Sequence, residues 1–251
     1  KKKPTYIIYS WPYSEEVGGF IALHSLCDQL RKAGRKAYIW PAGLTLSPQF
    51  RLKRAWLQAL NGHRSPLNVQ FRLNPTFDTS VAAPEDLSDA IVVYPEVVAG
   101  NPLNAKKIVR WLLNKPGRLT GNIQYTDDEL YFFYQEAFND PDLNPHPENK
   151  LQIVTIFEDT FRQTKPLEGR SGTCYILRKG KNRAPDAHKL DGPVIDNLPH
   201  QKIAEIFNNH EYCVSYDMHT MYSVYAAMCG CKSIVQPEPG LPKNEWQPSV
   251  E

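Results

Sequence analysis

The chain has 251 residues and a formal net charge of +2, since 29 Lys and Arg nearly balance 27 Asp and Glu. With 41% hydrophobic and 22% charged residues, the composition is that of a folded globular protein and excludes a wholly disordered chain. The near-neutral charge argues against nucleic acid as a partner, so any anionic ligand must be held by a local cluster of basic residues. The sequence has no apolar run near the roughly 18 residues of a membrane span and no signal-peptide core, which favours a cytoplasmic protein.

The cysteines predict no chemistry of their own. They form no CxxC pair and no zinc-type spacing with the seven histidines. Their neighbours in the sequence are apolar, so we expect buried free thiols of a reducing compartment. The five are Cys27, Cys174, Cys213, Cys229 and Cys231.

The first clear pattern is a strand, a Gly-rich loop, a helix and a second strand. Residues 5–10 form a β-branched and aromatic run typical of a buried parallel strand. A loop over 11–19 leads into an amphipathic helix that ends at Gly34, and residues 36–41 form the next strand. This order predicts a βαβ unit, whose crossover is nearly always right-handed.

The middle of the chain continues the alternation less clearly. Residues 50–60 are consistent with a basic helix, and residues 89–96 with a buried strand. We expect a helix over 104–113 and further strands over 130–134 and 151–157. Such alternation predicts a doubly wound parallel sheet.

A second series of strands and helices begins near residue 170. We therefore expect an α/β protein with two Rossmann-like lobes, 1–164 and 165–251, the second short or truncated. Because the chain starts without Met and its second lobe is short, we also expect a piece of a larger, multidomain protein. The expected elements of this lobe are strands at 172–177, 212–216 and 232–236, and helices at 199–208 and 221–228.

Four basic side chains, Arg178, Lys179, Lys181 and Arg183, follow the first strand of the second lobe. Open α/β sheets bind ligands at the carboxyl ends of their strands. There Arg can bind two phosphate oxygens at once and Lys acts as a point charge, so the cluster is a candidate diphosphate clamp. The alternative is a solvated charged loop.

Two further segments are candidates for binding phosphate or sugar. Asp217, His219 and Thr220 precede a helix whose unpaired backbone N–H groups and dipole favour phosphate oxygens. Alternatively, Asp217 or Thr220 only caps that helix. In the first lobe, Gly18 and Gly19 allow a phosphate or sugar to approach the backbone closely, or form a tight turn.

Together these segments resemble the GT-B glycosyltransferases, in particular the large retaining family with an N-terminal Gly-Gly signature. Here that signature covers residues 18–34. The family's C-terminal signature has two Glu eight positions apart, and this chain has Asp217 and Tyr225 at that spacing, so both acids differ. The pattern is most similar to bacterial surface-polysaccharide transferases, including rhamnosyl-type enzymes of O-antigen synthesis.

The resemblance implies a metal-independent transfer of a hexosyl or deoxyhexosyl group from a nucleotide-diphosphate donor, with no other cofactor. It implies that lobe 165–251 binds this donor and that lobe 1–164 lies on the side of a glycan or lipid-linked acceptor. Membrane-associated acceptors of this kind suggest a location at the inner face of the membrane, as a peripheral or multidomain partner.

The resemblance also assigns roles to individual residues. It places Asp217 against the donor sugar and Tyr225 against the nucleotide ribose. Arg178 with Lys179 or Lys181 would neutralise the diphosphate, and Gly18 with Gly19 would face the donor.

The stereochemistry of the reaction stays open because the signature acids differ. An inverting reaction would need a base near the acceptor hydroxyl, and His24, Glu15, Glu16 and Glu96 are the candidates, each of which also fits a structural role. The main alternative function is a non-catalytic GT-B-like module that binds glycan or a partner within a larger assembly protein. A nucleotide-sugar epimerase or dehydrogenase is disfavoured because no GxGxxG follows the first strand.

Overall fold

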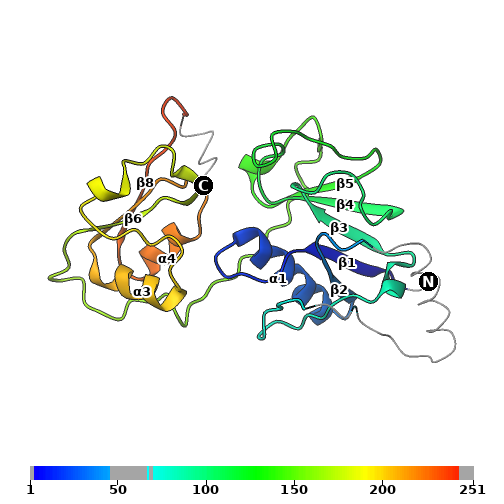
Figure 1. Ribbon diagram of the computed structural model, residues 1–251, viewed down its shortest axis with the longest axis horizontal. Coiled ribbons are helices and arrows are strands. Elements are labelled where there is room, and N and C mark those ends of the chain that lie inside the picture. The colour runs from blue at the N-terminus through cyan, green and yellow to red at the C-terminus, as the bar shows by residue number, and fades with distance from the viewer. Residues whose placement is uncertain (1–2, 46–66, 68–69, 243–251) are drawn as a thin grey trace. The chain divides into compact units, whose positions relative to one another are not determined.

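The computed structural model describes residues 3–45, 67 and 70–242, and the chain divides into two compact units (Figure 1). Unit 1 is Lys1–Thr155 and unit 2 is Ile156–Glu251. The expected basic helix over 50–60 lies outside the described residues. None of the described helices is long and apolar enough to cross a membrane.

The division between the units falls earlier than the expected 164/165 because the segment before that point packs into unit 2. Phe157 and Phe161 contribute their rings to the core of unit 2. The N–H of Thr164 donates to Oδ1 of Asn208 at 2.7 Å, and the amide of Asn208 donates back to the carbonyl of Arg162 at 3.0 Å. These contacts tie the segment to the helix that carries Asn208.

Unit 1 is built on a five-stranded parallel sheet in the order β2-β1-β3-β4-β5. Ile7 and Ile8 of the central strand β1 are both fully buried and belong to clusters on opposite faces, as expected of a parallel strand covered on both sides. The strands are β1 (Thr5–Ser10), β2 (Lys36–Pro41), β3 (Ile91–Pro95), β4 (Lys107–Leu112) and β5 (Leu130–Phe133), with single-turn 3-10 helices at Pro84–Leu87 and Glu136–Phe138.

Helix α1 (Gly18–Lys32) crosses from β1 to β2, as the periodicity predicts. Its buried side chains Ala22, Leu23, Leu26 and Cys27 lie on one face and pack with Trp111 of β4. The helix begins at Gly18, so the glycine pair forms the first turn of the helix and not the loop before it.

Two expected elements of unit 1 are wrong. The segment expected to be a helix at 104–113 is strand β4, in which Val109 and Trp111 join one core cluster while Ile108 joins the other. That alternation has the period of a strand. The strand expected over 151–157 is also absent, because the pairing with β5 is limited to a bridge between Phe133 and Lys150.

Unit 2 contains a three-stranded parallel sheet in the order β6-β7-β8. Helices α3 and α4 follow β6 and β7 in the chain and share one core with the strands (Figure 1). The expected strands and helices of this unit are confirmed within one or two residues. They are β6 (Thr173–Ile176), α3 (His200–Asn209), β7 (Tyr212–Ser215), α4 (Tyr222–Met228) and β8 (Lys232–Val235), with 3-10 turns at Arg178–Gly180 and Ala187–Lys189.

The sheet of unit 2 has a topological switch point between β6 and β7. On its other side β6 pairs with Val194 through a parallel bridge, supported by hydrogen bonds from Tyr175 to Pro193 and from Ile195 to Tyr175, each 2.9 Å. The chain therefore leaves β6 toward one side of the sheet and returns on the other. Unit 1 has the same kind of order, with β1 between β2 and β3. Ligands of open α/β sheets bind where the strand order reverses, beyond the carboxyl ends of the strands.

Candidate functional site at the carboxyl ends of β6 and β7

The segments that follow β6 and β7 are in direct contact at the switch point of unit 2. Gly180, in the 3-10 turn after β6, packs against the backbone of Tyr216 after β7. A Cβ placed on Gly180 would lie only 1.9 Å from the Tyr216 carbonyl oxygen. The structure thus brings together the basic segment and the Asp217 segment, which are far apart in the sequence.

The backbone at the end of β6 forms an anion-binding nest that is filled by the chain itself. Leu177 has right-handed helical dihedrals, and Arg178 has a φ of 39°. Successive residues of this kind point their N–H groups to one spot. Both N–H groups donate to the carboxylate of Asp196, at 3.1 Å from Leu177 and 2.6 Å from Arg178. Sequence reasoning missed Asp196, although an acid right after the buried Ile195 was a usable signal.

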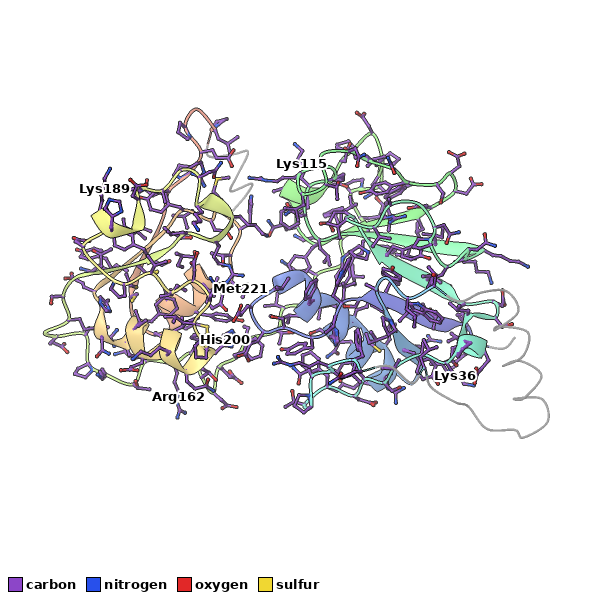
Figure 2. The ribbon with its side chains drawn as sticks, in the orientation of Figure 1. Lys36, Lys115, Arg162, Lys189, His200 and Met221 are labelled. Atoms are coloured by element: carbon purple, nitrogen blue, oxygen red, sulfur yellow. The ribbon has the colours of Figure 1, made fainter. Side chains whose placement is uncertain are left out.

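Arg178 is held in an unusual conformation. Among the described non-glycine residues, the others with positive φ are all Asp or Asn, which tolerate that region far better than Arg does. The guanidinium of Arg178 is 4.9 Å from the centre of the Tyr222 ring. The Tyr222 hydroxyl in turn lies 3.1 Å from Nε2 of His200, the first residue of α3 (Figure 2). A guanidinium over an aromatic ring is held by a cation–π interaction, and its planar fork fixes the N–H donors relative to one another.

The remaining basic residues of the cluster fall into two kinds. Arg183 donates to the carbonyl oxygens of Tyr216 and, at 3.2 Å, of Gln236, so it joins the ends of β7 and β8. Lys179 and Lys181 are exposed, and neither forms an ion pair with any residue that the structure describes. The cluster therefore combines one structural arginine, one arginine held over an aromatic ring and two exposed amines.

The segment after β7 is well ordered by its own polar side chains. Asp217 is only 4% exposed, and its Oδ1 accepts the N–H of His219 at 3.1 Å. The hydroxyl of Thr220 accepts the N–H of Tyr222 at 3.3 Å. The N-cap position of α4 itself is Met221, without a side-chain cap. Asp217 and Thr220 thus satisfy backbone donors on the approach to α4.

Tyr225 lies in the core of unit 2. Its side chain is 3% exposed, and its ring stacks on Phe161 with the centroids 4.2 Å apart and the planes 3° from parallel. This burial argues against the contact between Tyr225 and a ribose that the family resemblance implies. Asp217 is equally buried, and it differs from Tyr225 by its position in the segment after the carboxyl end of β7 and not in the aromatic core.

His24, the expected base in unit 1, is fully buried on α1. Its Nε2 lies 3.0 Å from the carbonyl oxygen of Trp11, so that nitrogen carries the proton, and Nδ1 has no hydrogen-bond partner among the described residues. Burial lowers the pKa of His24 below its ordinary 6.5. A neutral imidazole has the right protonation for a base, but its burial argues against direct contact with an acceptor.

The other candidates in unit 1 lie after β1 and β3. The N–H of Glu16 donates to Oγ of Ser14 at 3.3 Å. Gly18 has room for a side chain, and a Cβ on Gly19 would meet only Leu113, at 3.8 Å, so packing does not require either glycine. Glu96 is buried and accepts the N–H of Leu113 at 3.0 Å, a structural contact between the ends of β3 and β4.

Within the described part of the chain, no three His, Cys, Asp or Glu side chains gather to hold a metal ion. The one Asp-x-Asp sequence is at Asp140 and Asp142, where Oδ1 of Asp140 accepts the N–H of Asp142 at 3.1 Å in a turn.

No known protein family, curated protein or solved structure matches the chain.

Proposed function

We propose that the chain is a glycosyltransferase that moves a hexosyl or deoxyhexosyl group from a nucleotide-diphosphate donor to a glycan or lipid-linked acceptor. The observation that carries the proposal is the meeting of the Arg178 and Asp217 segments at the switch point of unit 2. This is the edge at which open α/β sheets bind ligands. A GT-B protein also contains two α/β units, and each unit of this chain has a parallel sheet.

The charges at this edge suit the chemistry of the reaction. As the bond to the sugar breaks, negative charge grows on the departing nucleoside diphosphate. Arg178, Lys179 and Lys181 would supply positive charge for it. Arg178 is held over the Tyr222 ring, and preorganised charge of this kind is a large source of catalysis. The sugar meanwhile becomes positive, and the fixed carboxylate of Asp217 would stabilise it.

Unit 1 would then bind the acceptor. The carboxyl end of β1, where the strand order reverses, leads into Glu16, Gly18 and Gly19. The open space beside Gly18 supports an approach of substrate to the backbone at the start of α1. Glu16 is a better candidate for contact with an acceptor than His24, because Glu16 is only half-buried.

The test is titration with the nucleoside diphosphates UDP, GDP and dTDP, with the monophosphate CMP as a comparison, followed by thermal unfolding and calorimetry. A ligand at 100 times its dissociation constant stabilises the protein by about 2.7 kcal/mol, which is readily measured. We expect one nucleotide to bind, and Arg178→Ala to weaken its binding. Arg162→Ala is the matched control, because Arg162 is an exposed arginine of the same unit (Figure 2). If none of the three nucleoside diphosphates shifts the unfolding midpoint, the proposal is wrong.

The burial of Tyr225 and His24 favours a second candidate, a non-catalytic GT-B-like module that binds glycan or a protein partner. The two functions differ in a turnover assay. A transferase hydrolyses or transfers sugar from a panel of nucleotide sugars, and Asp217→Asn lowers that rate. A binding module retains glycan on an array without releasing any nucleoside diphosphate.

A further inference from the structure

Asp196 is fixed in place by the sheet of unit 2. It follows Ile195, which is buried and donates its N–H to the carbonyl of Tyr175 in β6 at 2.9 Å. The backbone that leads into Asp196 also packs closely against β6, since a Cβ on Gly192 would lie 1.7 Å from the Thr173 carbonyl oxygen. Directly after it, Asn197 turns the chain with a φ of 62°. The carboxylate of Asp196 is therefore presented beside the end of β6 with little freedom.

The position of this carboxylate determines which groups remain for a diphosphate. The N–H groups of Leu177 and Arg178 both donate to Asp196, so this backbone nest is occupied and does not bind a phosphate. The side chains at the site must then supply the positive charge. Arg183 is held by the carbonyls of Tyr216 and Gln236. Lys179 and Lys181 are exposed, whereas Arg178 packs against the ring of Tyr222.

The same two hydrogen bonds hold Arg178 in its left-handed conformation. A β-carbon makes that region unfavourable, so without the carboxylate the backbone of Arg178 would relax toward the right-handed or extended regions. Such a rotation redirects the side chain away from the Tyr222 ring. We infer that Asp196 is a positioning residue, which fills the backbone nest and thereby orients the Arg178 guanidinium toward the donor diphosphate. This inference rests on the proposed function.

The experiment measures the dissociation constants of UDP, GDP and dTDP by calorimetry for wild type, Asp196→Asn, Arg178→Ala and the double variant. Because Asp196 acts through Arg178, we expect each single change to weaken binding by about tenfold and the double variant to bind no more weakly than Arg178→Ala. Asp186→Asn is the matched control, since it removes the same charge from an exposed acid of the same unit, and it should leave binding unchanged.

A second measurement separates positioning from a general loss of folding. In Asp196→Ala, added acetate supplies a carboxylate to the empty nest and should restore nucleotide binding, whereas equal chloride should not. The inference would be overturned if the losses of binding free energy of the two single variants added up in the double variant, or if acetate did not restore nucleotide binding. Tighter binding by Asp196→Ala would also overturn it, because the nest would then be the phosphate site. If wild type binds none of the three nucleotides, the proposed function itself fails, and the inference with it.

Discussion

Replacing Gly180 with Ala tests whether the candidate site depends on the close contact between the segments after β6 and β7. The new Cβ would lie 1.9 Å from the carbonyl oxygen of Tyr216 and 2.3 Å from its carbon, whereas real Cβ contacts are essentially never below 3.0 Å. The two backbones must therefore separate by at least 1.1 Å, the difference between 3.0 and 1.9 Å. A flexible side chain cannot absorb this movement, because the obstructing atoms are backbone.

The cost of this separation follows from its size. Overpacking in a well-packed region costs about 1–3 kcal/mol. Unit 2 has 96 residues (251 minus 156, plus one), and in a domain of that size each kcal/mol lowers the unfolding midpoint by about 4–8 °C. We therefore expect Gly180→Ala to lower the midpoint of unit 2 by roughly 10 °C. Nucleotide binding should weaken as well, because Arg178 lies in the displaced segment.

The buried cysteines allow the assay to follow one unit at a time. Four of them, Cys174, Cys213, Cys229 and Cys231, lie in unit 2, and Cys27 lies in unit 1. Alkylation with iodoacetamide during a temperature ramp, with peptide mass spectrometry, reports when each thiol becomes exposed. We expect the four unit 2 thiols to react at lower temperature in Gly180→Ala, with Cys27 unchanged. A midpoint equal to that of wild type would refute the reasoning.

Three further predictions concern unit 1. Gly18→Ala should leave the unfolding midpoint unchanged or slightly raised, since the new Cβ meets nothing within 4 Å. Weaker binding of nucleotide or acceptor by this folded variant would support a role of Gly18 in the approach of substrate. Glu129→Gln should cost about 3–5 kcal/mol in urea unfolding, because Glu129 and Arg110 form a fully buried ion pair with Nε to Oε2 at 2.7 Å; a loss below about 1 kcal/mol would contradict this. Burial keeps the pKa of His24 below 6.5, so the unfolded state takes up a proton that the folded state does not, and stability should fall as the pH drops below about 6.5. His24→Gln should remove that dependence in unfolding curves measured from pH 5 to 8, and an unchanged slope would count against it.

The stability of unit 1 should decline further in acid because of Glu129. Burial alone would raise the pKa of this carboxyl, but hydrogen bonds from Arg110 and Thr126 outweigh it and leave the pKa below the ordinary value of 4.5. The folded state thus holds the charged form more strongly than the unfolded state. Its contribution is present above pH 4.5 and is lost as the pH falls through the lower pKa of the folded state.

Several elements could be predicted from the sequence because their signals are local. Ile7 and Ile8 are adjacent in β1, so their side chains point to opposite faces of the sheet. Apolar residues at both positions indicate a strand that is covered on both faces, and both side chains are buried. The helical spacing of Leu23 and Cys27 on α1 is equally local. The strands and helices of unit 2 follow from the same two periods, which also place the Arg178 and Asp217 segments directly after strands.

What the sequence determined by itself was therefore the α/β alternation and the strand ends at which polar side chains gather. Tertiary structure decided the rest, because the deciding partners are distant in the chain. The segment expected to be a helix at 104–113 is a strand, in which Arg110 is buried and paired with the distant Glu129. Tyr225 became a core residue by stacking on Phe161. The nest at Arg178 is filled by Asp196, eighteen residues further along, a contact that only the folding of the Val194 segment against β6 could create.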